Sequence, residues 1–390
     1  MSAQKNQPRR HGDTETLCVS VSLWLILSMF SASSVSTTPR TPRVRFPVRL
    51  TSRRAGAAIV GAIALLALAA PFVAPHAVDA RFDGFLNAPP TVPHVRDAAG
   101  GWHAPFVYPW ILVSQLEQRY EQDRASPVAL RWLTGGRLVQ SSGDARAPLL
   151  WLGADSFGRD VFSRLLFGAR VSLGLAFLSA LGAVVIGAAL GGVAGYAGGA
   201  LDDALMRATD FVMVLPAMYV ALALRSVLPL VLAPHLVFVL LAAIFTIVGA
   251  PFVARGVRGI VRTERRLEYA VAAQAIGATA LRSLIRHLLP ATRGFLAVEI
   301  TTLVPAFIIA EATLSYVGLG FPDPVASWGT MLHDASSVRA FADFPWLLSP
   351  AAAIFLVVLG LNLLFQQAGV PVYNESDESV RNLRANSHPV

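Results

Sequence analysis

The sequence predicts an all-α membrane protein, a six-span helical bundle with one extracytoplasmic insert. Of the 390 residues, 54% are hydrophobic and only 14% are charged. The mean hydropathy of +0.56 lies far from that of soluble globular proteins. Uncharged stretches long enough to cross a bilayer recur along the chain, and one polar, proline-rich stretch separates the first of them from the rest.

The charge pattern favours a membrane orientation over a nucleic-acid partner. The formal net charge is +8, but the arginines gather beside hydrophobic stretches, as the positive-inside rule describes. The single cysteine, Cys18, excludes an intramolecular disulfide and a multi-cysteine metal site, and we expect no metal site. The one lysine, Lys5, belongs to no Gly-x-x-x-x-Gly-Lys-Ser/Thr pattern. We therefore expect no catalytic residue and no nucleotide hydrolysis in this chain.

Residues 1–54 are predicted to be an N-terminal extension and a basic cytoplasmic segment. The apolar run over 21–30 is short for a span, so it is typical of a signal-peptide-like segment, a signal anchor or an extension translated upstream of the true start. The last two are favoured. Arginines over 40–54 precede an uncharged stretch, which predicts a first transmembrane helix over 55–75 that enters from the cytoplasm.

Residues 76–165 are predicted to form an extracytoplasmic insert followed by an interfacial helix. Prolines and glycines argue against a long helix in the insert, apart from one short amphipathic helix over 113–124. The insert either contacts a partner or caps the pore entrance. In the interfacial helix Asp160 and Arg164 are spaced as an i, i+4 ion pair, and Arg159 and Arg170 are long enough to reach lipid headgroups.

The core over 166–366 is predicted to hold the other five spans. In the second span, over 171–201, glycines recur at every fourth position, which lets a neighbouring helix approach closely. These glycines are Gly187, Gly191, Gly195 and Gly199. Asp202 and Asp203 are predicted to end this span.

The later spans are predicted from further uncharged stretches. They are expected over 206–228, with a kink at Pro216, over 235–254, after Arg293, and over 346–364, before a cytoplasmic tail at 367–390. Three acidic residues fall inside them, namely Asp210, Glu299 and Glu311. Because an intramembrane carboxylate is costly, we expect these three to face the bundle interior, a pore or a partner helix.

A cytoplasmic loop over 256–292, which follows a run of arginines, is predicted to contain a helical hairpin over 268–290. Apolar residues at helical spacing mark two short arms: Tyr269, Ala272, Ala273 and Ile276 in the first, and Leu281, Leu284, Ile285 and Leu288 in the second. Gly277 is the predicted hinge, Thr279 the predicted cap of the second arm and Pro290 its stop. With Arg282, Arg286 and His287 on its outer side, the hairpin suits a groove on a soluble partner.

The hairpin resembles the cytoplasmic coupling loop of ABC importer permeases. The pattern of that family runs Glu-Ala-Ala, three residues, Gly, and then Leu-Pro. The matching residues here are Ala272, Ala273, Gly277, Leu289 and Pro290. Val271 and His287 depart from the pattern, and Glu268 is the substitute for its glutamate.

Two further blocks resemble permeases of the oligopeptide, dipeptide and nickel type. The first matches Gly-Thr-Asp-x-x-Gly-Arg-Asp-Val-x-Ser-Arg and the following Tyr-Gly-x-Arg. Its agreeing residues are Gly153, Asp155, Gly158, Arg159, Asp160, Ser163, Arg164, Gly168 and Arg170. The second block, over 310–315, contains Glu311 and continues through Ser327, Trp328 and Gly329. Beyond residue 364 the chain departs from the family pattern.

The resemblance implies a multi-pass permease subunit of a bacterial ABC importer in the inner membrane, of the second, C-type kind. Its implied partners are a homologous permease, two cytoplasmic ATP-binding subunits, an extracytoplasmic solute-binding protein and membrane lipid, without nucleic acid. ATP and Mg²⁺ are implied on the partner subunits, and no cofactor on this chain. The implied cargo is peptides or related small solutes, with nickel and opine-like solutes left open.

An alternative is a stand-alone proton- or ion-coupled secondary transporter. Asp210, Glu299 and Glu311 are then the ion sites. A membrane enzyme is a third reading, but it needs clustered His, Ser and Asp, and the eight histidines are scattered along the chain.

Overall fold

The computed structural model describes residues 49–97, 101–142, 146–215, 219, 223 and 233–365. All of them belong to the second of two units, Met1–Val48 and Arg49–Val390. The expectations for the N-terminal extension up to residue 48, for the kink at Pro216 and for the tail at 367–390 concern residues outside this described part.

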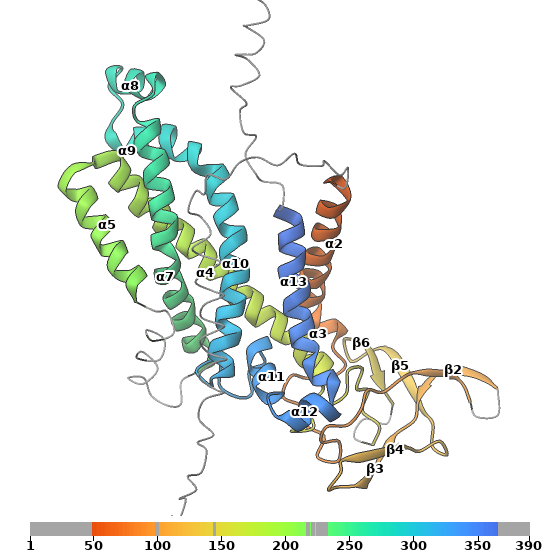
Figure 1. Cartoon of the computed structure of the whole chain (residues 1–390). Helices are drawn as coiled ribbons and strands as arrows, with labels where there is room; N and C mark the ends of the chain where they lie inside the picture. Colours follow the sequence, from red (N-terminus) through yellow and green to blue (C-terminus); the bar gives the residue numbers. More distant parts are fainter. Residues whose placement is uncertain are drawn as a thin grey trace, which may run out of the picture. The chain divides into compact units, whose positions relative to one another are not determined.

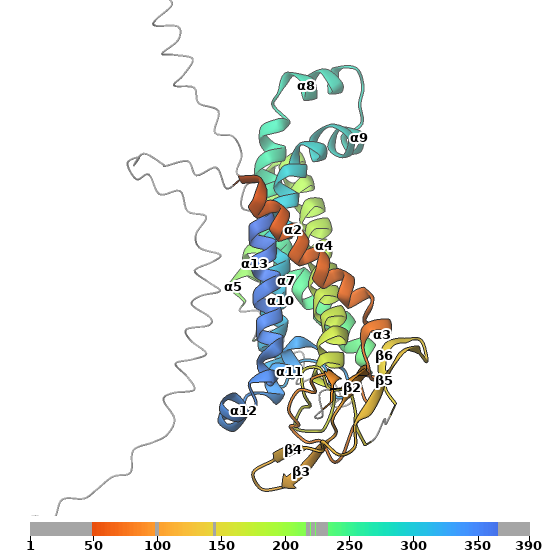
Figure 2. The same cartoon turned by 90° about the vertical axis from the view of Figure 1, so that its right-hand side faces the viewer.

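Four helical stretches of the described part are long and apolar enough to cross a membrane. They are Val161–Ala197, Pro234–Glu264, Ala280–Tyr316 and Pro345–Leu364. Helix α2 (Arg49–Leu68) begins in the predicted arginine block and packs against α13 (Ser349–Phe365), and the two helices lie side by side in both views (Figures 1 and 2). Helix α5 (Gly199–Val214) has 16 residues. The count of six spans stays a prediction.

Helices α4 (Val161–Ala197) and α7 (Pro234–Glu264) pack closely along three of the predicted glycines. A Cβ at Gly187, Gly191 or Gly195 would lie 2.6, 2.2 or 2.8 Å from the carbonyl oxygen of Ala250, Ala254 or Arg258, respectively. The backbone of α7 therefore occupies the space that a side chain on α4 needs.

The predicted end of this span at Asp202 and Asp203 is wrong. Helix α4 ends at Gly198, whose φ of 67° breaks the helix, and Gly199 lies beyond it with open space around it. Asp202 belongs to α5 and pairs with Arg258 of α7. The prediction placed the end of the span at a charged residue, Asp202, whereas the helical backbone ends at Gly198.

The core of the bundle forms where α10 (Arg293–Tyr316) packs on α4 and α7. Leu175 and Phe245 are buried there with Leu303 and Ile308, and Phe245 stacks on Phe307 with ring centroids 5.3 Å apart. This apolar contact holds together the three helices that the hairpin predicted over 268–290 adjoins.

The insert is a β-structure, in contrast to the short helix predicted over 113–124. A four-stranded antiparallel sheet has the order β1–β2–β5–β6, and a separate hairpin pairs β3 with β4. The strands are β1 (His94–Arg96), β2 (Trp102–Val107), β3 (Trp110–Ser114), β4 (Arg119–Gln122), β5 (Val128–Thr134) and β6 (Arg137–Ser141). Gly135 and Gly136, with φ of 62° and 77°, close the β5–β6 hairpin as such a two-residue turn requires.

The insert is tied to the helices by hydrogen bonds. Short elements surround this end of the bundle: α3 (Ala70–Val73), α11 (Trp328–Asp334), α12 (Val338–Asp343) and η3 (Pro345–Leu348). Arg339 of α12 donates to the carbonyl of Leu116 at 3.1 Å, and Trp346 donates to the carbonyl of Ala154 at 3.1 Å. Figure 1 places these elements and the strands at the end of the helices opposite to α8 (Glu268–Ala275) and α9 (Ala280–Ser283).

Candidate functional site

The hairpin predicted over 268–290 has the expected hinge. Its first arm is α8, and Gly277 follows with φ of 94°, in the left-handed region that glycine tolerates. The second arm opens with α9, whose cap Thr279 accepts a hydrogen bond from the backbone N–H of Arg282. The sequence thus predicted the turn of this hairpin from residues that fix the backbone locally.

The second arm does not stop at Pro290, contrary to the prediction. Helix α9 continues through the π-helical turn η1 (Leu284–Leu288) and the 3-10 turn η2 (Leu289–Thr292) into α10. Pro290 is tolerated because it occupies the first turn of η2, where its missing N–H is not needed. The hairpin is consequently joined to α10 by an unbroken helical backbone (Figure 2).

The tip of the hairpin exposes apolar side chains. Ile276 is 88% exposed and Leu281 is 67% exposed, whereas Ala270 is the one residue of α8 that is buried. The other predicted coupling residues on the surface are Glu268, Ala272 and Arg286, with Ala273 half-buried. Apolar residues in water beside basic ones suit the surface of another protein.

The base of the hairpin is anchored on α4. Leu288 is fully buried, and a Cβ at Gly192 of α4 would lie 3.3 Å from Leu289 and 3.4 Å from Leu284. In the first arm of the hairpin, the hydroxyl of Tyr269 donates to Glu264 at 2.6 Å. Burial, and after it the hydrogen bond with Glu264, raises the pKa of Tyr269 to about 12, so its hydroxyl stays a donor at neutral pH.

A charge cluster lies at the other end of the bundle. Arg159 is 1% exposed and makes three charge-assisted hydrogen bonds. Its Nε donates to Asp155 Oδ2 at 2.7 Å, its Nη1 to Asp323 Oδ1 at 2.5 Å and its Nη2 to Asp334 Oδ2 at 2.9 Å. Arg81 also donates to Asp323. The prediction that Arg159 reaches lipid headgroups is therefore wrong, because its guanidinium is buried among carboxylates.

The predicted Asp160–Arg164 ion pair is also absent, and the separate interfacial helix with it. Helix α4 begins only after Asp160, whose side chain caps it by accepting from the N–H groups of Phe162 and Ser163 at 3.1 and 3.2 Å. Gly158, with φ of 71°, lets the loop pass close to the carbonyl of Phe82. Arg170 lies exposed on α4, outside the charge cluster.

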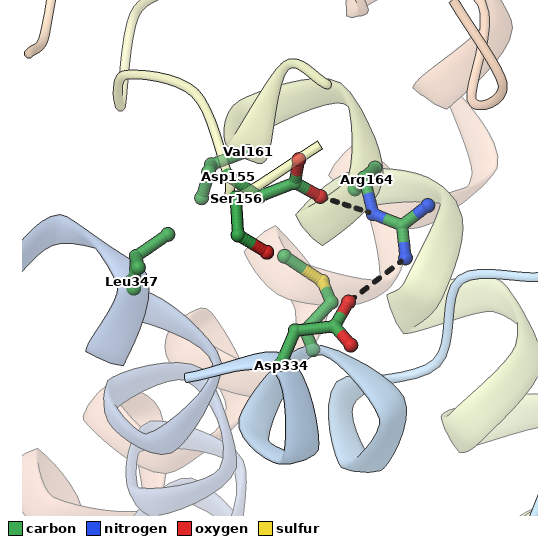
Figure 3. Close-up of a pocket in the computed structure, with 7 residues that line it drawn as sticks. Asp155, Ser156, Val161, Arg164, Asp334 and Leu347 are labelled. Carbon is green, nitrogen blue, oxygen red and sulfur yellow. Dashed lines mark ion pairs between the residues drawn. The ribbon is translucent and has the colours of Figure 1, made fainter. Parts of the chain in front are cut away.

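Arg164 lies between two cavities. It is 2% exposed, with its Nε 3.6 Å from Asp155 Oδ2 and its Nη2 3.8 Å from Asp334 Oδ2, the two ion pairs drawn in Figure 3. One cavity, of about 10 Å³, has room for a single water, and the other holds about 170 Å³. Burial raises the pKa of Asp334, and the lowering by Arg159 and Arg164 does not offset it.

The three carboxylates predicted to be intramembrane share no partner among the residues that the structure describes. Glu311 is fully buried and accepts from Ser172 at 2.9 Å and from Ser315 at 2.7 Å. Asp210 is exposed and pairs with Arg255 of α7, and Glu299 is half-buried on α10. Glu311 thus ties α4 to α10 with hydroxyl donors, and through Ser172 it reaches the backbone N–H of Trp328.

Comparisons with known proteins match the part of the chain that carries the hairpin. Residues 183–368 match the family described as binding-protein-dependent transport system inner membrane component. The chain is 38% identical over 215 residues to the oligopeptide transport system permease protein OppC of Bacillus subtilis, a match that covers 55% of this chain and 68% of that protein. The chain belongs to this family. It is a multi-pass permease subunit of the inner membrane.

Two other relatives of the permease are named for different cargoes. The dipeptide transport system permease protein DppC of Bacillus subtilis is 38% identical over 214 residues, which cover 55% of this chain and 65% of that one. The glutathione transport system permease protein GsiD of Pectobacterium atrosepticum is 39% identical over 214 residues, which cover 55% and 69%. The stand-alone ion-coupled transporter finds no support among these relatives.

Sequence reasoning missed part of the permease's charge cluster. Asp323 and Asp334 lie far along the chain from Arg159, and spacing gives no sign of such a pairing. Nor did the sequence indicate that Ser172 and Ser315 bind Glu311, because serine is common in apolar helices. The β5–β6 hairpin did carry a signal, the Gly135-Gly136 pair between two apolar runs.

Proposed function

We propose that this permease moves peptides or related small solutes across the inner membrane, driven by ATP that two partner subunits bind with Mg²⁺ and hydrolyse. This cargo class is supported by the relatives, which are named as transport permeases for oligopeptides, dipeptides and glutathione. In the proposal a homologous permease completes the pore, an extracytoplasmic binding protein delivers the solute, and lipid surrounds the bundle. In the proposal this chain itself binds neither ATP nor a metal ion.

The observation that carries the proposal is the coupling hairpin, an exposed apolar tip on an anchored base. Ile276 and Leu281 face water at the tip, whereas Leu284 and Leu288 are buried at the base. A groove on the ATPase that covers the tip removes this apolar surface from water, which favours docking.

The mechanism follows from how the base is fixed. The second arm runs without a break into α10, and α10 packs on α4 and α7. Because α7 fits against the glycines of α4 with no side chain between them, a displacement of the docked hairpin moves this helix group as a packed unit. ATP binding then selects between inward-facing and outward-facing arrangements of the helices.

Affinity purification tests the partnership. The tagged full chain is purified from its native membrane in mild detergent, the chains that accompany it are identified, and ATPase activity is measured. We expect an ATPase and a second permease to co-purify with nucleotide hydrolysis. A chain that comes out alone and without ATPase activity contradicts the proposal.

The hinge variant Gly277→Asp tests the coupling role. Gly277 has open space around it, so the substitution acts through the left-handed backbone and the new charge, not through a clash. We expect peptide uptake to fall at least about ten-fold, a loss of roughly 1.4 kcal/mol in coupling, while membrane insertion is unchanged. The matched control is Gly136→Asp in the insert, which has a similar φ of 77° and the same open space. Normal uptake by Gly277→Asp refutes the hinge assignment.

A further inference from the structure

The larger cavity beside Arg164 has polar walls of both charges. It holds about 170 Å³, and its polar lining residues are Arg164, Ser315, Asp323, Thr330, His333 and Asp334. Asp323 has a 55% exposed side chain and His333 is exposed, so these two residues form the rim toward the aqueous phase. Gly318 contributes no side chain, which leaves room inside.

Two groups of opposite charge on this wall are unused within the described residues. Arg164 Nη1 is buried and has no hydrogen-bond partner there. Figure 3 shows this third guanidinium nitrogen directed away from the residues around the smaller cavity. The described contacts of Asp334 with Arg159 and Arg164 all use Oδ2, so Oδ1 remains as an acceptor. A buried guanidinium without a hydrogen bond costs free energy that a ligand in the cavity removes.

The cavity, which Arg164, Asp323 and Asp334 line together with His333, adjoins a cluster of three arginines and three aspartates whose formal charges balance. Arg81, Arg159 and Arg164 carry three positive charges, and Asp155, Asp323 and Asp334 carry three negative ones. A ligand with a net charge would leave an uncompensated charge in a site that is partly buried. A neutral ligand that carries both signs satisfies the donor and the acceptor together.

We propose that this cavity binds a small zwitterion of the α-amino acid class. The ligand's carboxylate accepts a hydrogen bond from Arg164 Nη1, and its ammonium group donates to Asp334 Oδ1. A volume of about 170 Å³ has room for a small amino acid such as glycine or alanine. The site lies at the end of the bundle opposite to the coupling hairpin (Figure 1), and the proposal is independent of which solute is transported.

Equilibrium binding of tritiated glycine tests the site. The probe is titrated onto the full chain in lipid nanodiscs by scintillation proximity, with alanine, acetate and methylamine as competitors. We expect saturable binding at one site per chain that alanine displaces, whereas acetate or methylamine at the same concentration does not. Absence of saturable binding means that the cavity holds water only and overturns the proposal. Displacement by acetate as effective as that by alanine means a simple anion site and overturns it too.

Substitutions assign the two contacts. We expect Arg164→Lys and Asp334→Asn each to weaken glycine binding at least about ten-fold. Lysine keeps the charge but lacks the planar guanidinium with its Nη1 donor, and asparagine lacks the negative charge that pairs with the ammonium group. The matched control is Arg170→Lys, an exposed arginine on the same helix, which should leave the affinity unchanged. Thermal unfolding of each variant separates loss of the site from loss of the fold.

Unchanged affinity in a folded Arg164→Lys or Asp334→Asn chain contradicts the assignment. If neither variant folds, the competition pattern on the unmodified chain decides by itself. A negative result here leaves the co-purification test of the importer assembly untouched, because that test involves the opposite end of the bundle.

Discussion

Arg159 and Arg164 belong to one charge cluster, yet their charges are paired to different degrees. Both guanidinium groups are buried. Arg159 makes three hydrogen bonds between 2.5 and 2.9 Å, whereas the ion pairs of Arg164 are 3.6 and 3.8 Å long. Arg159 therefore acts as the structural tie, since it joins the loop before α4 to Asp323 and to α11. Arg164 retains Nη1 as a donor that has no hydrogen-bond partner among the described residues.

Removal of the Arg159 charge should destabilise the permease strongly. Arg159→Gln leaves the carboxylate of Asp155, which is 4% exposed, without its main partner, and breaking such a buried pair costs about 3–5 kcal/mol. The matched change Arg119→Gln breaks an exposed pair with Glu121, which is worth about 0–1 kcal/mol. Thermal unfolding in detergent measures both variants. Equal melting temperatures speak against a structural role for the cluster.

The close contact of α4 with α7 makes a second prediction at the scale of one residue. In Gly191→Ala the new Cβ lies 2.2 Å from the carbonyl oxygen of Ala254, so the helices must separate, at a cost of about 1–3 kcal/mol. Gly174→Ala on the same helix meets open space and serves as the control. We expect only the first variant to melt at a lower temperature. A melting curve of Gly191→Ala that matches the control's shows that the glycine contact is not needed.

At the scale of elements, the coupling hairpin has one free arm and one fixed arm. Helix α8 is exposed apart from Ala270 and the half-buried Ala273, whereas the second arm continues into α10 and packs on α4. A partner that binds the free arm therefore acts on a rigid base. The β3–β4 hairpin of the insert is instead held at its turn, because the Arg339 side chain donates to the carbonyl of Leu116.

Charge at the hairpin tip should separate docking from folding. In Ile276→Asp a side chain that is 88% exposed becomes charged, so we expect little change in melting temperature but loss of the co-purified ATPase. Leu116→Asp in the insert changes an equally exposed leucine at the other end of the bundle. It should keep the ATPase bound. Retention of the ATPase by Ile276→Asp places the docking surface elsewhere.

At the scale of the whole described chain, functional groups divide between the two ends of the helices. The hairpin lies at one end, and the insert with the charge cluster lies at the other (Figures 1 and 2). The arginines that lead into the hairpin, among them Arg262, Arg265 and Arg266, favour the cytoplasm for that end. The insert then faces the extracytoplasmic side, where the proposed function places the solute-binding protein.

Labelling of single cysteines tests this orientation. In a Cys18→Ser background, Ser126→Cys lies in the insert and Ala275→Cys in the hairpin, and both positions are exposed. A membrane-impermeant maleimide should label Ser126→Cys in intact spheroplasts and Ala275→Cys only after permeabilisation. Labelling of both positions from outside contradicts the predicted orientation.

Local signals in the sequence predicted the hinge, the cap and the tight helix contact. Gly277, Thr279 and the glycines at 187, 191 and 195 act through their own backbone or through the absence of a side chain, which residue type alone reveals. Other local signals misled. Pro290 predicted a stop, although its place in a first turn allows a helix to continue, and Asp202 predicted a helix end but forms an ion pair.

The sequence by itself determined the class of the molecule, because a bilayer demands long apolar helices and leaves their composition visible. It also determined the hairpin, since glycine and threonine fix a turn within a few residues. Only the tertiary structure decided the partners of Arg159 and Glu311, the pairing of β2 with β5 in the insert and the cavity at Arg164. Those features join residues that are distant along the chain. The sequence alone does not indicate which opposite charge a distant charged residue will contact.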